Sequence, residues 1–406
     1  MSISDLLVRD RVCLTVRPVV PNANHRVSGR PTWAEIDLDA LAHNLQIIRN
    51  HVSPDVKVLA AVKADAYGHG AIQCARRLQY EGVDWFGVAL PEEGIDLRAN
   101  GITKPILCLG GFWQGQEAAL LRQDLTPVVY RIDQLDSINR AAQNAGVIAN
   151  VHVKVDSGMG RLGVPDDALP DFCEALSRFA NIRVDGLLTH LASADDVAHQ
   201  EFTRKQLRRF RVAVDLFRSR GIAPSYIHAA NSAATFAFEK SWGNMVRVGG
   251  SLYGFARDVF PSNIEVPELR PVMTLRSRIL LPKNVAKGEP LGYGCTFETT
   301  RDSLIATLPV GYDDGYRRAL SNRGRVILRG RFAPVVGRVS MDLTLIDVTD
   351  VPGATLDDEV VLLGSDGPLT ISAEDIAEVI DTISYEVTCG ISSRVPRIFY
   401  ENKKAQ

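Results

Sequence analysis

A single lysine, Lys63, lies in the stretch Ala60–Gly70 (AAVKADAYGHG), where apolar residues give way to small residues and glycine. The preceding run, Val56–Val62, is apolar except for Lys57, which predicts a strand buried on both faces of a parallel sheet. Lys63 would then emerge at the carboxyl end of the strand, the edge where such folds bind ligands. Burial there disfavours the ammonium form, as attack by the amine on an aldehyde cofactor requires. A surface lysine at a strand end is the alternative interpretation.

The elements that would position Lys63 follow one rhythm, in which a short apolar run leads through a turn into a segment with helical periodicity. Eight runs predict strands: Lys57–Val62, Trp85–Leu90, Pro105–Leu109, Thr126–Tyr130, Ile148–Val155, Ile182–Thr189, Tyr226–Ala230 and Met245–Val248. Segments such as Ala71–Tyr80, Ile132–Ala145 and Gln200–Arg218 predict the helices between them. Eight such units favour a (β/α)8 TIM-type barrel over an open doubly wound sheet.

The pattern changes after Gly254. Alternating apolar and polar residues in Val272–Leu281 and glycine-containing turns predict β structure, and Ala373–Ile383 is the one segment there with a helical pattern. The sequence therefore predicts an α/β fold in three parts. These are an irregular N-terminal extension over residues 1–30, the barrel over residues 31–264 and a mostly β C-terminal domain over residues 265–406.

Composition argues against several classes of function. The chain of 406 residues carries 46 Lys+Arg against 48 Asp+Glu, so no nucleic-acid or anionic-membrane partner is expected. The expected partner is a small molecule. Charges interrupt every apolar run among the first thirty residues, which predicts neither a signal-peptide core nor a membrane span. The six cysteines have no CxxC spacing, which argues against a metal site or a disulfide framework and favours a reduced, cytoplasmic location.

Further polar residues are expected at the same edge of the barrel as Lys63. They are Arg161 after the fifth predicted strand, His190 at the end of the sixth, Asn231 and Ser232 after the seventh, and Arg247 on the eighth. Ser232 is expected to begin a helix over residues 233–238, and Gly249 would let the backbone approach an anion, which favours a phosphate site there. An ordinary N-cap and a tight turn are the alternatives, as are a salt-bridged arginine and a buried histidine for Arg247 and His190.

The motif AVKADAYGHG resembles the cofactor-lysine signature of the bacterial alanine racemases, a family of fold-type III enzymes dependent on pyridoxal 5′-phosphate. The resemblance extends from Thr32–Leu38 (TWAEIDL) to Ser393–Arg397 (SRVPR). It implies that L-alanine and D-alanine are interconverted by two bases acting on a Schiff base of alanine with the cofactor, supplying D-alanine for peptidoglycan. It also implies a homodimer, in which each site joins one barrel to the partner's β domain.

The resemblance also assigns roles to residues at matching positions. Lys63 would hold the cofactor and act as the base for one enantiomer, and Tyr293, lying between two glycines, would act on the partner's cofactor as the base for the other. Cofactor binding would fall to Tyr67 and Tyr385 at the phosphate, to Asn231, Ser232 and Gly249 beside it, and to Arg247 at the pyridine nitrogen with His190 against it. Substrate binding would fall to Arg161 and, at the partner's entrance, to Tyr312, Met341 and Asp342. Lys154 matches a lysine that is often carbamylated, and an unmodified lysine is the alternative.

Three other functions stay open at this point. A broad-specificity amino-acid racemase of the same fold is expected to carry a secretion signal. A fold-related decarboxylase would release carbon dioxide from a basic amino acid. A non-catalytic pyridoxal-phosphate carrier would lack the roughly 140 residues after the barrel.

Overall fold

The computed structural model describes residues 29–401. The predicted N-terminal extension lies almost wholly outside the described residues, and so does Cys13. The other five cysteines are free thiols. Within residues 29–401, no helix has the length and apolar character needed to cross a bilayer.

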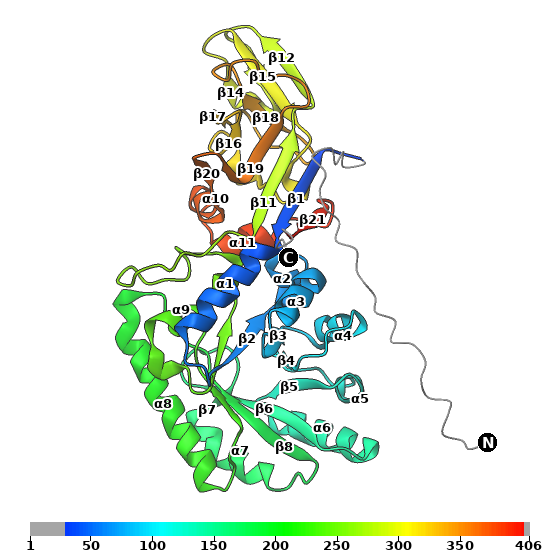
Figure 1. The fold of residues 1–406 in the computed structure, drawn as a ribbon, viewed down its shortest axis with the longest axis vertical. Coiled ribbons are helices and arrows are strands. Elements are labelled where there is room, and N and C mark those ends of the chain that lie inside the picture. Colours follow the sequence, from blue (N-terminus) through cyan, green and yellow to red (C-terminus); the bar gives the residue numbers. More distant parts are fainter. Residues whose placement is uncertain (1–28, 402–406) are drawn as a thin grey trace, which may run out of the picture.

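Eight parallel strands form a nearly closed barrel, in the lower part of Figure 1. In the order of their hydrogen bonding they are β10 (Met245–Val248), β2 (Lys57–Ala61), β3 (Trp85–Val88), β4 (Ile106–Cys108), β5 (Leu125–Val129), β6 (Ala149–Asp156), β8 (Ile182–Leu188) and β9 (Tyr226–His228). The short strand β7 (Val164–Pro165) pairs with β6. These strands coincide with the eight predicted runs, which confirms the TIM-type barrel.

Both faces of the barrel strands are apolar because both are covered. Leu59 and Trp85 belong to a buried cluster that fills the barrel interior, whereas Val58 and Ala60 alternate with Leu59 and join the outer core against the helices. The surrounding helices are α3 (Ala71–Tyr80), α4 (Pro91–Ala99), α5 (Glu117–Arg122), α6 (Ile132–Ala145), α7 (Leu169–Leu176), α8 (Gln200–Ser219) and α9 (Ser232–Ala237). α6 ends, as the sequence predicts, at a glycine in the left-handed conformation, Gly146 with φ of 66°.

The second part of the molecule is built mainly from strands, in the upper part of Figure 1. Its largest sheet has the order β17 (Arg331–Pro334), β16 (Arg325–Leu328), β19 (Glu359–Asp366), β11 (Met273–Arg278), β1 (Thr32–Asp37) and β21 (Arg397–Tyr400), with β20 (Leu369–Ile371) paired to β19. A smaller sheet contains β12 (Leu281–Val285), β15 (Ser303–Leu308) and β18 (Thr344–Asp347), and β13 (Pro290–Leu291) pairs with β14 (Phe297–Glu298). The predicted β C-terminal domain is thus present.

Two features of this part differ from the sequence-based expectation. β1 precedes the barrel in sequence but pairs antiparallel with β11 and parallel with β21, so the N-terminal strand crosses the predicted domain boundary, and α1 (Leu38–His51) leads back to the barrel. The predicted helix over residues 373–383 ends early, because α10 (Ala373–Ile380) stops at Asp381 with φ of 57°, and a second helix that was not predicted, α11 (Ser384–Cys389), follows it. α11 contacts the turn after β2 and brings Tyr385 to it.

Candidate active site

Lys63 begins a left-handed turn at the carboxyl end of β2. The four residues that follow it, Ala64, Asp65, Ala66 and Tyr67, have φ of 52°, 53°, 54° and 56°. Left-handed backbone costs an L-residue roughly 1–2 kcal/mol, and a run of four non-glycine residues is rare. Surrounding contacts must therefore impose this turn, which marks it as a candidate functional site.

Three side chains from different elements hold the turn. Glu93 of α4 accepts a hydrogen bond from Ala64 N at 2.6 Å. His69 is fully buried, and its Nδ1–H donates to the carbonyls of Ala66 and Tyr67 at 2.9 and 3.0 Å. Arg397 of β21 donates from Nε and Nη2 to the carbonyl of Gly68 at 3.2 and 3.1 Å. The resemblance gave none of these three residues a role, although His69 lies inside the quoted motif.

The surroundings of Lys63 favour its neutral amine. Burial lowers the pKa of Lys63, and the nearby Arg161 cation lowers it further. Glu93 opposes this shift, but its other carboxylate oxygen accepts from the amides of Ala89 and Leu90 at 2.7 and 3.1 Å. Both oxygens of Glu93 are therefore occupied by backbone donors, and Lys63 forms no ion pair within the described residues.

Arg247 on β10 has one donor left for a ligand. Its Nη1 donates to the carbonyl of His228 at 2.9 Å, and its Nη2 donates to the carbonyls of Thr189 and Ala229 at 2.7 and 3.1 Å and lies 3.4 Å from Nδ1 of His190. Within residues 29–401, the Nε–H has no acceptor. Burial lowers the pKa of Arg247 to about 10, so the guanidinium stays cationic at neutral pH.

A chain of two histidines, His228 and His152, extends from Arg247 into the barrel interior. The sequence analysis did not identify either of them. Nη1 of Arg247 lies 3.1 Å from Nδ1 of His228, and Nε2 of His228 lies 3.0 Å from Nδ1 of His152. Both imidazoles are fully buried. The signal that could have found them is a histidine inside an otherwise apolar barrel strand, in HVKV and in YIHA.

A group of hydroxyls and backbone amides, called the cradle below, lies between β10 and α9, and the residue that caps α9 beside it differs from the prediction. Asn231, not Ser232, caps α9 by accepting from Ala234 N at 3.0 Å. Ser232 Oγ instead accepts from Gly249 N at 2.9 Å and from the Oγ of Ser251 at 3.1 Å, so its own hydroxyl proton remains free. β9 ends at His228, two residues before the end of the predicted run, and α9 begins at Ser232, one residue before the predicted start, which puts Asn231 at the cap position.

Two tyrosines close the cradle from the other side. A Cβ on Gly249 would lie 2.4 Å from the hydroxyl of Tyr67, and a Cβ on Gly250 would lie 2.5 Å from the hydroxyl of Tyr385. Only glycine lets these hydroxyls approach the backbone this closely. Within the described part of the chain, neither hydroxyl has a hydrogen-bond partner, so both can donate to a bound anion.

Lys154 is a second buried amine near Lys63. Its side chain is almost fully buried and has neither an ion pair nor a hydrogen bond within the described residues. Burial, followed by repulsion from Arg247 and Arg161, lowers its pKa to about 8. Most of this amine is still protonated near physiological pH, but its neutral, nucleophilic fraction is far larger than that of an ordinary lysine.

The remaining predicted site residues, Tyr293, Tyr312, Met341 and Asp342, lie on the β part of the molecule. Tyr293 follows β13 on a turn between two glycines of positive φ and is 72% exposed. Tyr312 and Met341 are also exposed, and Asp342 forms an ion pair with Arg394 at 2.7 Å. β14, next to Tyr293, is in the upper part of Figure 1, far from the barrel. Of the predicted contacts, the one between His190 and Arg247 is present within one subunit, at 3.4 Å.

Both parts of the chain are similar to known proteins in sequence and in structure. Residues 36–257 match the family model "Alanine racemase, N-terminal domain", and residues 272–399 match "Alanine racemase, C-terminal domain". An alanine racemase of Halothermothrix orenii is 46% identical over 382 residues, covering 94% of this chain and 99% of the relative. A solved alanine racemase of Clostridium difficile 630 has a TM-score of 0.87 at 39% identity, covering 93% of this chain and 97% of that one. An alanine racemase from Bartonella henselae, solved with covalently bound pyridoxal phosphate, has a TM-score of 0.82 at 28% identity, covering 92% and 100%.

Proposed function

The chain belongs to the alanine racemase family and interconverts L-alanine and D-alanine, and we propose that it does so with pyridoxal 5′-phosphate, with Lys63 as one base and Tyr293 as the other. The observation that carries this proposal is the convergence of a half-buried lysine, an arginine with one free donor and an anion cradle at one end of the barrel. When bound, the cofactor supplies an aldehyde for an amine and an electron-withdrawing ring that acidifies the α-proton of alanine.

The residues present fit this cofactor. The free Nε–H of Arg247 suits the pyridine nitrogen, which is an acceptor. The hydroxyls of Ser232, Tyr67 and Tyr385 and the close backbone of Gly249 suit a phosphate. The amine of Lys63, whose pKa is lowered by burial, suits the aldehyde. Asn231 would support the phosphate loop through the α9 cap, and His190 would hold Arg247 in place.

Each base would serve one face of the substrate. Lys63, with its lowered pKa, would take the α-proton from one enantiomer and return it to the same face. A proton on the opposite face needs a second group, and we assign it to the partner's Tyr293, because Tyr293 is exposed in its own subunit and lies just before β14, which Figure 1 shows in the upper part of the molecule above the barrel. This assignment requires a homodimer with shared sites.

Substrate selection would come from both subunits. Arg161, a cation beside Lys63, would bind the carboxylate of alanine. Tyr312, Met341 and Asp342 of the partner would narrow the entrance and exclude larger amino acids. We also propose a cytoplasmic location, supported by the free thiols, and use of the D-alanine in peptidoglycan.

Two measurements on the purified protein test the proposal. With added cofactor, both enantiomers of alanine should exchange the α-proton with deuterated solvent, and borohydride reduction should attach the cofactor covalently to the peptide that contains Lys63. The variant Lys63→Ala should show neither and is the matched control. Absence of α-proton exchange from both enantiomers in the wild-type protein would refute the racemase mechanism. Release of carbon dioxide from a basic amino acid would instead favour the decarboxylase alternative.

A further inference from the structure

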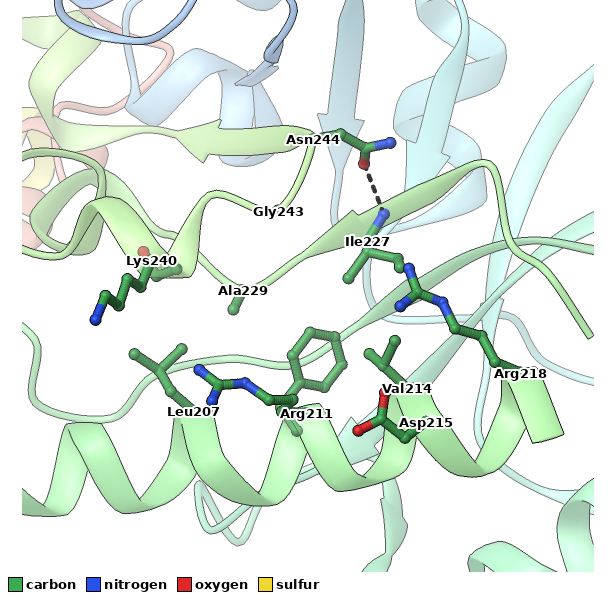
Figure 2. A pocket seen from close by; sticks show the side chains of 12 residues that line it. Leu207, Arg211, Val214, Asp215, Arg218, Ile227, Ala229, Lys240, Gly243 and Asn244 are labelled. Atoms are coloured by element: carbon green, nitrogen blue, oxygen red, sulfur yellow. Dashed lines mark hydrogen bonds between the residues drawn. The ribbon is translucent and has the colours of Figure 1, made fainter.

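A groove of about 380 Å³ lies on the outer side of the barrel, between α8, β9 and the segment 240–244 that leads into β10, as Figure 2 shows. The groove exists because α9, the helix after β9, has only six residues, whereas α8 has twenty. The outer side of β9 is therefore incompletely covered, and Ile227 remains half-buried there. This volume falls within the range of small-molecule sites.

The walls of the groove are apolar. Leu207, Phe210 and Val214 contribute side chains from α8, and Ile227 and Ala229 contribute them from β9 and the residue after it. The side chain of Asn244, at the upper edge, already forms hydrogen bonds within the protein. It accepts from Ile227 N at 2.8 Å and donates to the carbonyl of Ser225 at 2.7 Å. The walls thus favour an apolar ligand body rather than a hydrogen-bonded one.

The ends of the groove are cationic. Arg211 and Arg218 of α8 and Lys240 after α9 line it, and all three are exposed at its edge (Figure 2). Within residues 29–401, none of the three forms an ion pair or a side-chain hydrogen bond. Asp215 is the one carboxylate among the residues that line the groove, so cations outnumber anions three to one. An anionic group would balance this charge.

The groove also lies directly behind the proposed cofactor arginine. Side chains alternate along β9, so Ile227 and Ala229 face the groove while His228 between them faces the barrel interior. His228 contacts Arg247 at 3.1 Å. A molecule in the groove would therefore touch the outer face of the strand segment that supports Arg247.

We propose that this groove is a second ligand site, which takes an amphipathic anion: an aromatic or alkyl body that carries a carboxylate, sulfonate or phosphate group. The apolar walls bind the body, and Arg211, Arg218 and Lys240 bind the charge. The site is separate from the active site and does not depend on the proposed function.

The test uses the anionic dye 8-anilinonaphthalene-1-sulfonate on the enzyme saturated with pyridoxal phosphate, so that the active site is not open to the dye. Fluorescence titration should show one dye per chain, displaced by decanoate. The double variant Arg211→Glu with Lys240→Glu should weaken dye binding by at least tenfold. The control Lys205→Glu reverses one charge on α8 outside the groove, is matched to the single variant Arg211→Glu on the same helix, and should change binding less than twofold.

Two further binding measurements distinguish the contribution of charge to dye affinity from that of hydrophobicity. The neutral analogue N-phenyl-1-naphthylamine should bind at least tenfold more weakly than the sulfonate, and added salt should weaken only the sulfonate. Unchanged dye binding in the double variant would overturn the proposal, as would an equal loss in the Lys205→Glu control. Equal affinity for the neutral analogue would overturn the assignment of the ligand as an anion.

Discussion

Nη1 of Arg247 and Nδ1 of His228 lie 3.1 Å apart in the barrel interior. Because arginine can only donate, the imidazole accepts at Nδ1 and carries its proton on Nε2. His228 Nε2–H then donates to Nδ1 of His152 at 3.0 Å, which places the proton of His152 on its Nε2. That last N–H is buried without a partner in the described chain. The arginine thus fixes the tautomers of two histidines.

The first prediction compares these two histidines. His228→Leu removes a partner from both Arg247 and His152, and buried groups left unpaired cost about 1–3 kcal/mol each. His152→Leu removes the unpaired N–H of His152 but leaves the Nε2–H of His228 without an acceptor. The number of unpaired groups stays the same, so the loss of stability should be smaller. Urea unfolding of both variants measures the difference, and nitrogen-15 chemical shifts of the histidines report the tautomers directly. Equal destabilisation, or a proton on Nδ1 of His228 in the wild-type protein, would contradict the scheme.

The second prediction concerns the left-handed turn after Lys63. Ala64 is exposed with φ of 52°, where a β-branched residue is strongly disfavoured. Ala64→Val should lower the free energy of unfolding by about 1–2 kcal/mol or distort the turn and weaken cofactor binding. Ala64→Gly should do neither, since glycine adopts this conformation readily. Thermal unfolding and cofactor titration on both variants provide the measurement. A valine variant that matches the glycine variant in both respects would count against an imposed turn.

The third prediction separates the two residues at the start of α9. Asn231→Ala removes the cap and should cost about 0.5–2 kcal/mol of stability, with little change in the intrinsic affinity for phosphate. Ser232→Ala removes the free hydroxyl of the cradle and should weaken cofactor binding by about tenfold, the loss of one hydrogen bond to a charged group. Equilibrium dialysis of pyridoxal phosphate and urea unfolding distinguish the two effects. If Ser232→Ala lowered the stability instead, and Asn231→Ala weakened cofactor binding, Ser232 would be the cap of α9.

The difference between these two residues shows what the sequence could and could not predict. The strand runs and the glycine that ends α6 reflect local periodicity and backbone preference, and the structure confirms them. Whether Asn231 or Ser232 caps α9 depends on where β9 ends, and this end is set by pairing with β8. The contact of Arg397 with Gly68 joins residues 329 positions apart, so no local pattern could predict it.

The fourth prediction uses the buried amine of Lys154. Its pKa is lowered from 10.5 to about 8, so the unfolded chain binds more protons between these values and stability rises as pH rises through this window. Below about pH 8 the buried cation costs roughly 3 kcal/mol at most. In buffer free of carbon dioxide, Lys154→Met should therefore be more stable than the wild-type protein at neutral pH, and its advantage should shrink as the pH is raised.

Bicarbonate provides the control for this experiment. A carbamate on Lys154 would be an anion near Arg161 and Arg247, so bicarbonate should stabilise the wild-type protein and leave Lys154→Met unchanged. Chemical denaturation across the pH range, with and without bicarbonate, measures both effects. A methionine variant that is less stable than the wild-type protein without carbon dioxide would refute the unpaired-cation account of this site.

The fifth prediction tests the shared site. If Lys63 of one subunit works with the partner's Tyr293, a dimer of Lys63→Ala with Tyr293→Phe has one doubly mutated site and one wild-type site. Each variant alone should be nearly inactive, whereas an equal mixture, unfolded and refolded together, should regain about one quarter of wild-type activity because half of its dimers are mixed. Racemisation followed by polarimetry measures the recovery, and the mixture of separately refolded variants is the control. If the two variants remain inactive after refolding together while a wild-type sample refolds fully, both bases belong to the same chain and the proposed dimer is wrong.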